Sequence, residues 1–233
     1  MAAALGMGGN AWAQITAFTQ NFAGESASPS DYGFTISYGA GSNSNLVNFS
    51  VADGVLKCVA GPYANQSDGA RTGTATANFE AISSGNEITV SYTWALGSAT
   101  GNKSGSYTKT YIGNASGNAL EIAFYGSDSN GSLKVNGVTV KSGNTAIRNT
   151  TYTVTATLNM NAQKITALNL TCSNASYSYT ASENIDFASA ITTVDRFAFE
   201  NSERQNWDNT SSIDDVLITY VEAKELVESI TVN

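Results

Sequence analysis

A tryptophan in a polar stretch is the residue whose type and surroundings point most directly to ligand binding. Trp207 lies between Asn206 and Asp208, three residues after Arg204, and no alternation of apolar residues surrounds it. The flat face of an indole packs against the apolar C–H side of a sugar ring, while a nearby guanidinium or amide hydrogen-bonds to the hydroxyl groups. Trp207 with Arg204 is therefore our first candidate for a sugar-binding platform, and plain packing within a loop is the alternative.

Two other polar stretches combine aromatic and basic side chains. Tyr63 and Arg71 flank one of them, and Tyr107 and Tyr111 flank Lys109 in the other. Each stretch offers a ring and a cation to a ligand that has both apolar and hydroxyl surfaces. We take them as the second and third candidate binding surfaces, and the fold decides which of the three come together.

Catalytic groups are harder to find. The chain has no histidine, which excludes a Ser-His or Cys-His nucleophile and removes the usual base at neutral pH. Hydrolysis of a glycosidic bond needs two carboxylates held on one face. Glu200 and Glu203 are expected at a strand end and in a loop, where a solvated acidic loop explains them. We therefore expect no enzyme activity, with a polysaccharide lyase that uses Tyr and Arg, or a glycoside hydrolase, as the alternative.

The composition narrows the class of partner. Lys and Arg total 11 against 19 Asp and Glu, and the resulting net charge of −8 opposes binding to the phosphate backbone of nucleic acid. Charged residues make up only 13% of the chain, so Ser, Thr, Asn and Gly must cover much of the surface. No stretch is long and apolar enough for a membrane span. A polysaccharide or oligosaccharide suits this hydroxyl- and amide-rich surface.

Alternation of apolar and polar residues recurs along the chain, and helical periodicity is close to absent before residue 220. This pattern predicts an all-β fold, a two-sheet antiparallel β-sandwich, with Tyr92 and Trp94 in its core. Asn136-Gly137 is the strongest hairpin signal. The expected strands are residues 33–38, 55–59, 87–96, 119–125, 132–135, 138–140, 151–158, 164–172, 194–199 and 213–220. The expected irregular stretches are residues 63–72, 97–106 and 200–212.

The two ends of the chain differ from the middle. Residues 1–13 end in Ala-Trp-Ala, a pattern that precedes signal-peptide cleavage, so we expect a signal-peptide remnant and a secreted or cell-surface protein. The sandwich should span residues 14–221, and residues 222–233 should form a linker and the start of a following module. Cys58 and Cys172 either pair in an oxidising compartment or remain two separate buried thiols.

Several local patterns coincide in this sequence. They are Val-Ala-Asp-Gly-Val-Leu-Lys at residues 51–57, the hairpin at 133–140 around Asn136-Gly137, Thr-Tyr-Thr-Val at 151–154, Arg-Phe-Ala-Phe at 196–199 and Ile-Asp-Asp-Val at 213–216. Together they resemble bacterial concanavalin A-like jelly rolls of the laminin-G-like and carbohydrate-binding-module type, over residues 18–220. Val-Glu-Ser-Ile-Thr-Val at residues 227–232 is similar to the first strand of bacterial immunoglobulin-like modules.

The resemblance implies a jelly-roll fold and a non-catalytic carbohydrate-binding module of a secreted bacterial polysaccharide-degrading or glycan-adhering protein. It implies a monomer tethered to other modules. It also implies a structural calcium ion held by Asp214 and Asp215, at the start of the last strand, and by Asn21 and Glu25 near the first. A carboxylate pair in solvent is the alternative at that position. The other class of function is a structural or adhesin domain that binds protein or acts as a spacer.

Replacing Trp207 separates the platform role from the packing role. If the indole stacks on a sugar, Trp207→Ala should weaken binding by roughly 1–3 kcal/mol, or about five- to 150-fold, with little change in stability. A buried tryptophan would instead cost about 3–5 kcal/mol of stability. Calorimetric titration and a denaturation curve on the same variant distinguish the two, and full affinity would remove Trp207 from the binding site.

Overall fold

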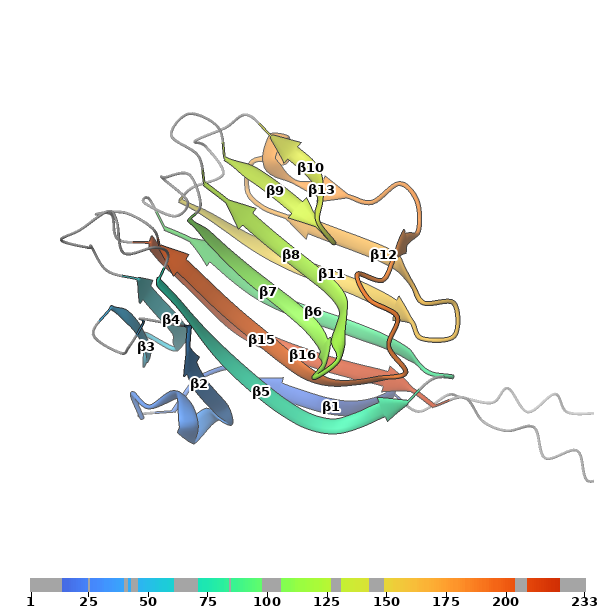
Figure 1. Ribbon diagram of the computed structural model, residues 1–233, viewed down its shortest axis with the longest axis horizontal. Coiled ribbons are helices and arrows are strands. Elements are labelled where there is room, and N and C mark those ends of the chain that lie inside the picture. Colours follow the sequence, from blue (N-terminus) through green and yellow to red (C-terminus); the bar gives the residue numbers. More distant parts are fainter. Residues whose placement is uncertain are drawn as a thin grey trace, which may run out of the picture.

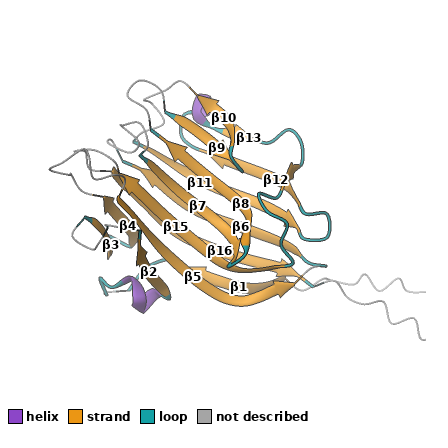
Figure 2. Cartoon of the chain, viewed as in Figure 1, coloured by secondary structure: helices purple, strands orange, loops and turns teal. Residues whose placement is uncertain are grey.

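The computed structural model describes residues 14–24, 26–39, 42, 46–60, 71–83, 85–97, 106–126, 131–142, 149–203 and 209–222. Their strands form two antiparallel sheets that pack face to face as a sandwich (Figure 1). The helical elements of the described chain are short 3-10 turns, and the rest of it forms strands and loops (Figure 2). The all-β, two-sheet antiparallel sandwich expected from the alternation pattern is confirmed.

The strands of each sheet follow an order that differs from their order in the sequence. Sheet A runs β13 (Tyr179–Thr180), β12 (Lys164–Thr171), β11 (Thr150–Asn159), β6 (Glu87–Leu96), β16 (Asn209–Val221), β4 (Val55–Ala60) and β3 (Val47–Ala52), with β1 (Gln14–Gln20) beside β16 and β14 (Ile185–Asp186) beside β12. Sheet B runs β10 (Val138–Ser142), β9 (Ser132–Val135), β8 (Gly117–Tyr125), β7 (Tyr107–Asn114), β15 (Thr193–Glu203), β5 (Arg71–Ser83) and β2 (Phe34–Tyr38).

The turn predicted at Asn136-Gly137 is present, and an Asp-Gly pair forms a second turn of the same kind. Asn136 (φ 47°) and Gly137 (φ 80°) join β9 to β10, and Asp53 (φ 55°) and Gly54 (φ 75°) join β3 to β4. Two successive residues with positive φ give the backbone the twist that a two-residue hairpin needs, and Asn, Asp and Gly tolerate that conformation best. These turns fix the register of both hairpins.

Apolar residues fill the space between the sheets, as their alternation predicts. Tyr92 is 2% exposed and Trp94 is fully buried, which confirms both as core residues. The ring of Tyr92 packs edge-on against Phe197 of the opposite sheet, with the centroids 5.4 Å apart. Such aromatic contacts across the sandwich add to the burial of apolar surface that holds the sheets together.

The two cysteines are free thiols. Cys58 is fully buried on β4, and Cys172, which follows β12, is partly exposed. Of the two alternatives left open by the sequence, the pairing is therefore wrong, and only Cys58 is a buried thiol. Burial raises the pKa of the Cys58 thiol, which keeps it protonated and unreactive.

The long strand β5 was not predicted from the sequence, because its composition is unusual for a strand. Its inward positions are small, since Gly73 is followed by the fully buried Ala75 and Ala77. A Cβ atom on Gly73 would lie 2.6 Å from Val47 Cγ1 and 2.8 Å from Phe49 Cε2 on β3. Sheet A approaches β5 so closely that large apolar residues do not fit, and the usual strand pattern is absent.

The strand β7 was also not predicted, because both of its faces are polar. Thr108 and Thr110 point inward and are buried. Their hydroxyls hydrogen-bond to Ser211 and Tyr92 of sheet A, at 3.0 Å for the Thr108–Ser211 pair. A buried hydroxyl is tolerated when it has such a partner. The side chains of β7 therefore alternate between the inner and the outer face, but the inner residues are polar, so hydrophobicity does not alternate along the strand.

The prediction of an irregular stretch at residues 200–212 is wrong at both of its ends, and residues 204–208 lie outside the described residues. Strand β15 continues to Glu203 and strand β16 begins at Asn209. Glu203 is fully buried, and its Oε1 accepts a hydrogen bond of 2.6 Å from Ser106 Oγ. The hydrogen-bonding residues Asn201 and Ser202 are also fully buried. These polar side chains lie inside the sandwich and form hydrogen bonds there. Because they are polar, their sequence has the composition of a loop although it forms a strand.

Strand ends from both sheets meet at one end of the sandwich. The register places Glu203 opposite Arg71, Asn209 opposite Ala60, and Ser202 opposite Tyr107. The other end of the sandwich brings the start of β1 next to the end of β16 (Figure 1). No helix among the described residues is long and apolar enough to cross a membrane.

Candidate functional site

The outer face of sheet B carries a group of aromatic and charged residues on neighbouring strands. Because β7 alternates, Tyr107, Lys109 and Tyr111 point outward and are half-buried. Outward residues of β8, β9, β15 and β5 surround them. We call this surface the tyrosine face, and it comprises Tyr107, Lys109, Tyr111, Glu121, Tyr125, Lys134, Arg196, Glu200 and Thr74.

Cations lie against the rings of this face. Tyr107 and Tyr125 are paired across β7 and β8, with ring centroids 5.4 Å apart. Lys109 Nζ is 4.5 Å from the Tyr107 centroid, and Lys134 Nζ is 4.7 Å from that of Tyr125. Contacts of this kind contribute roughly 0.5–1 kcal/mol each at exposed sites. They hold the rings and the ammonium groups in a fixed arrangement.

Arg196 extends the tyrosine face toward a shallow cavity. Its guanidinium carbon is 5.6 Å from the Tyr111 centroid, and its Nη2 donates to Asn118 Oδ1 at 3.4 Å. The cavity beyond it has a volume of about 400 Å3 and is lined by Thr76, Asn78, Phe79, Ala81, Ala115, Asp195 and Arg196. A hollow with one aromatic wall and several polar groups therefore continues the line of tyrosines.

Two carboxylates form the polar centre of the tyrosine face. Glu200 Oε2 accepts hydrogen bonds from Tyr111 Oη at 3.2 Å and from Thr74 Oγ1 at 3.0 Å. Glu121 forms an ion pair with Lys109, with Oε1 and Nζ 3.6 Å apart. The carboxylates thus orient the phenol and the ammonium group, while their remaining lone pairs can accept from a ligand.

The surroundings keep the phenols protonated. Burial, followed by the charge of Glu200, raises the pKa of Tyr107 to about 12 and raises that of Tyr111 further. Burial alone would lower the pKa of Lys109, but the charge of Glu121 and the other groups near it outweigh this effect, so its pKa is raised. At neutral pH the tyrosine face therefore offers neutral phenols and a charged amine. A tyrosine acting as a base would need the opposite shift.

Only part of the sequence-based set lies on this surface. Tyr107 and Tyr111 are central to it, whereas Arg71 begins β5 opposite the buried Glu203, at the end of the same sheet. Tyr63, Arg204 and Trp207 lie outside the described residues, so their roles stay predictions. Glu121, Tyr125, Lys134 and Arg196 were not candidates in the sequence, and Glu200 had been assigned to an acidic loop. The polar alternation Tyr-Thr-Lys-Thr-Tyr was the one signal that could have shown a two-faced polar strand.

The proposed calcium ligands come together in part. Asp214 and Asp215 do not begin the last strand, as predicted, but lie at a bulge inside β16, where Asp215 has φ 51°. Gln20, the residue before Asn21, pairs with Val216, the residue after Asp215. Glu25 lies outside the described residues.

The type of donor suits calcium, which binds six to eight oxygen atoms. Asp214, Asp215 and Asn21 supply three oxygen-bearing side chains. The described part of the chain contains no group of three or more His, Cys, Asp or Glu residues that could hold a metal ion. Backbone carbonyls and water would have to complete the shell. Burial and the charge of Asp215 raise the pKa of Asp214.

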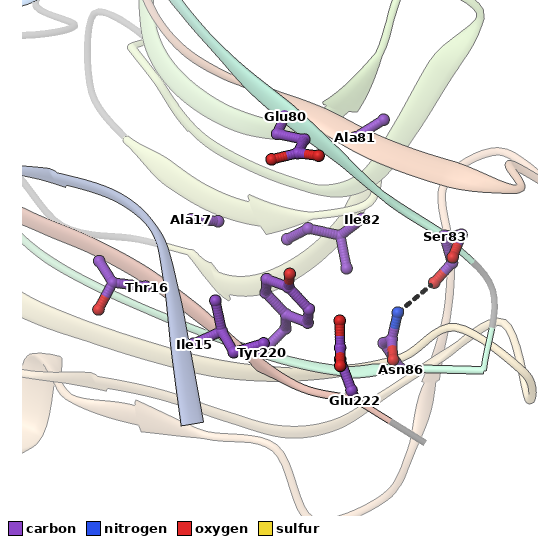
Figure 3. A pocket seen from close by; sticks show the side chains of 10 residues that line it. All are labelled: Ile15, Thr16, Ala17, Glu80, Ala81, Ile82, Ser83, Asn86, Tyr220 and Glu222. Atoms are coloured by element: carbon purple, nitrogen blue, oxygen red, sulfur yellow. Dashed lines mark hydrogen bonds between the residues drawn. The ribbon is translucent and has the colours of Figure 1, made fainter. Parts of the chain in front are cut away.

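Two further cavities lie away from the tyrosine face. One, of about 230 Å3, lies between β1 and β5 and is drawn in Figure 3, where Glu80 and Glu222 face it from opposite sides and Asn86 Nδ2 donates to the Ser83 carbonyl. The other, of about 280 Å3, lies between the β9–β10 hairpin and the segment around β14. Neither contains a basic side chain stacked on a ring, and neither includes a residue predicted to bind a ligand.

Comparison with solved structures identifies the fold. The chain is similar to a lectin from Bauhinia forficata in complex with GalNAc, with a TM-score of 0.59 and 11% identity over 91% of this chain and 100% of the lectin. It is similar to the CBM2 module of Dit from Lactobacillus casei BL23 phage J-1, with a TM-score of 0.53 and 10% identity over 92% of this chain and 99% of the module.

A third similar structure is a mutant of an alginate lyase in complex with an alginate trisaccharide, with a TM-score of 0.50 and 14% identity over 91% of this chain and 98% of the lyase. The chain has the concanavalin A-like jelly-roll fold. No known protein-family model and no curated protein matches the sequence. At these identities the concanavalin A-like fold is what the structures share, and the side chains of this chain determine its ligand.

Calcium binding at Asp214 and Asp215 can be tested by thermal melts. An ion that binds the folded state alone should raise stability by roughly 2–3 kcal/mol at a concentration about a hundredfold above its Kd. We expect a higher melting temperature in calcium than in chelator, and loss of this difference in Asp214→Asn/Asp215→Asn. Glu183→Gln, at an exposed site, is the control. Equal melting temperatures and no metal by elemental analysis would exclude the site.

The raised tyrosine pKa values predict a loss of stability at high pH. A phenol ionises near pH 10.0 in the unfolded chain, whereas Tyr107 holds its proton to about 12 and Tyr92 and Tyr111 hold theirs longer. Their contribution is full below pH 10 and disappears as the pH rises through the folded-state values. Urea unfolding at a series of pH values, with ultraviolet titration of the phenols, should show this loss. Ionisation of all tyrosines near pH 10 without loss of stability would contradict it.

Proposed function

We propose that this domain is a non-catalytic carbohydrate-binding module and that it binds glycan on the tyrosine face. The observation that carries the proposal is the combination of Tyr107, Tyr111 and Tyr125 with Glu200 and the neighbouring cations on one exposed sheet. Sugar sites combine aromatic surface for C–H groups with fixed planar hydrogen-bonding groups for hydroxyls. Structures that share the fold include a lectin in complex with GalNAc and a CBM2 module, which supports this class of ligand.

The arrangement suits a chain of sugars better than one sugar. The residues of the tyrosine face come from five adjacent strands, from Lys134 on β9 to Thr74 on β5, and the cavity beside Arg196 lies at one side of them. Neighbouring strands are about 4.8 Å apart, so the face spans roughly 19 Å across the sheet. We infer that a polysaccharide or oligosaccharide lies across the strands. Trp207 and Arg204 remain proposed additional contacts.

The wider setting also remains a proposal. The composition and the first residues favour a secreted or cell-surface protein, and we propose a bacterial polysaccharide-degrading or glycan-adhering protein in which this domain is a monomer tethered to other modules. A hydroxyl-rich surface with few charged residues, together with a net charge of −8, favours a glycan over nucleic acid as partner.

A polysaccharide lyase is the second candidate, because one of the similar structures is an alginate lyase in complex with an alginate trisaccharide. The raised pKa of Tyr107 and Tyr111 makes both phenols poor bases at neutral pH, which favours binding without catalysis. Incubation with a polysaccharide panel and measurement of reducing ends and of unsaturated products would reveal a hydrolase or a lyase. A domain that binds no glycan would instead be a structural or adhesin domain.

Replacing Tyr111 tests the binding surface. On the polysaccharide that binds best in a gel-retardation panel, Tyr111→Ala should weaken binding by roughly 1–3 kcal/mol, or about five- to 150-fold, because it removes ring surface and a hydroxyl aligned by Glu200. Tyr179→Ala, which truncates a half-buried tyrosine of sheet A, is the matched control and should retain affinity. Equal affinity in both variants would place the glycan elsewhere, and a panel without any binding would refute the proposed function.

A further inference from the structure

Charges on the tyrosine face alternate in sign across the strands. Lys109 forms an ion pair with Glu121 of β8 on one side, and on the other side the register of β7 and β15 places Glu200 opposite it. The side chains of Lys109 and Glu121 are only 17% and 25% exposed. Because partly buried charges are screened less than exposed ones, this carboxylate–ammonium–carboxylate row acts on a ligand at close range.

The row leaves an excess of negative charge at the centre of the tyrosine face. The single ammonium group of Lys109 lies there between two carboxylates, those of Glu121 and Glu200. The other two cations flank the row: Lys134 stacks on Tyr125, and Arg196, whose guanidinium carbon is 5.6 Å from the Tyr111 centroid, shares the neighbouring cavity with Asp195. The central ring hydroxyl of Tyr111 already donates to Glu200. The centre thus presents acceptor atoms to a ligand, and it presents no surplus of positive charge.

This distribution of charge fits one class of glycan. Hydroxyl groups of an uncharged sugar donate to carboxylates, and such charge-assisted hydrogen bonds are stronger than neutral ones. An anionic substituent, either the carboxylate of a uronic acid or a sulfate group, would instead lie close to Glu121 and Glu200. Like charges brought together at an interface are unfavourable. The net charge of −8 adds a long-range repulsion of the same sign.

We propose that the Glu121–Lys109–Glu200 row makes the domain selective for uncharged polysaccharides and against polysaccharides that carry carboxylate or sulfate groups. The proposal rests on the proposed function, since it names the class of glycan bound at the same face. It assigns the selectivity to Glu121, which was not a candidate in the sequence, and to Glu200, which the sequence pattern assigned to an acidic loop.

The test uses polysaccharide pairs that share a backbone and differ in charge. Suitable pairs are hydroxyethyl cellulose with carboxymethyl cellulose, methyl-esterified with de-esterified homogalacturonan, and desulfated with native carrageenan. We expect at least one uncharged member to bind, and its charged partner to bind at least about tenfold more weakly at low ionic strength, with a smaller difference in high salt.

Two double variants with the same net charge locate the selectivity. Glu121→Gln/Glu200→Gln removes both carboxylates of the row, and Glu87→Gln/Glu183→Gln removes two exposed carboxylates outside the tyrosine face. The first should bind the charged member several-fold more tightly than the wild type does, while the second should change this affinity by less than about twofold. Thermal melts and circular dichroism confirm that both variants are folded before binding is compared.

The possible outcomes separate the selectivity from the proposed function. Equal or tighter binding of the charged members by the wild type would overturn the selectivity while leaving carbohydrate binding intact. Equal effects of the two double variants would show that net charge, and not the row, sets the preference, and would also overturn the assignment. If no member of any pair binds, the proposed function itself fails, and the selectivity with it.

Discussion

The inner side of β7 is held by hydrogen bonds that cross the sandwich. Thr108 and Thr110 are buried, and each hydroxyl has a partner on sheet A, Ser211 for the first and Tyr92 for the second. Ser211 in turn donates to Asn201 Oδ1 of β15 at 3.1 Å. A buried hydroxyl without a partner would cost about 1–3 kcal/mol, so these bonds penalise any other register. Because a slip of one residue exchanges the two faces of a strand, the same bonds keep Tyr107, Lys109 and Tyr111 on the outside.

The outer surface follows from this internal constraint. With β7 fixed between β8 and β15, Tyr125 lies beside Tyr107, and Glu200 lies where it can accept from Tyr111. The cations then pack on rings whose positions the backbone already determines. A site built on the middle strands of a sheet is held more rigidly than one built on loops, since neighbouring strands support it on both sides. Little rearrangement would be needed before a ligand binds.

The parts of the fold that the sequence predicted are those in which hydrophobicity alternates. Strands β6 and β9 agree with prediction residue for residue, and Asn136-Gly137 forms the expected turn. Prediction failed where the interior is polar or crowded: β5 uses Gly73 and alanines because sheet A lies close, and the end of β15 buries Glu203. For the candidate site, Tyr107 and Tyr111 were recognised by type. Their neighbours Glu121 and Glu200 come from other strands, and only the pairing of those strands reveals them.

The pairing of β1 with β16 places Gln14 directly opposite Val221, while Tyr107 lies near the other end of the sandwich, where Thr108 meets Ser211. A short linker could therefore join residues 14 and 221, and new termini could be opened at an exposed turn such as Asp53-Gly54. Circular permutation succeeds most often at such exposed sites between neighbouring ends. The domain could equally be inserted into a surface loop of another protein through this pair of strands, with the tyrosine face directed away from the host.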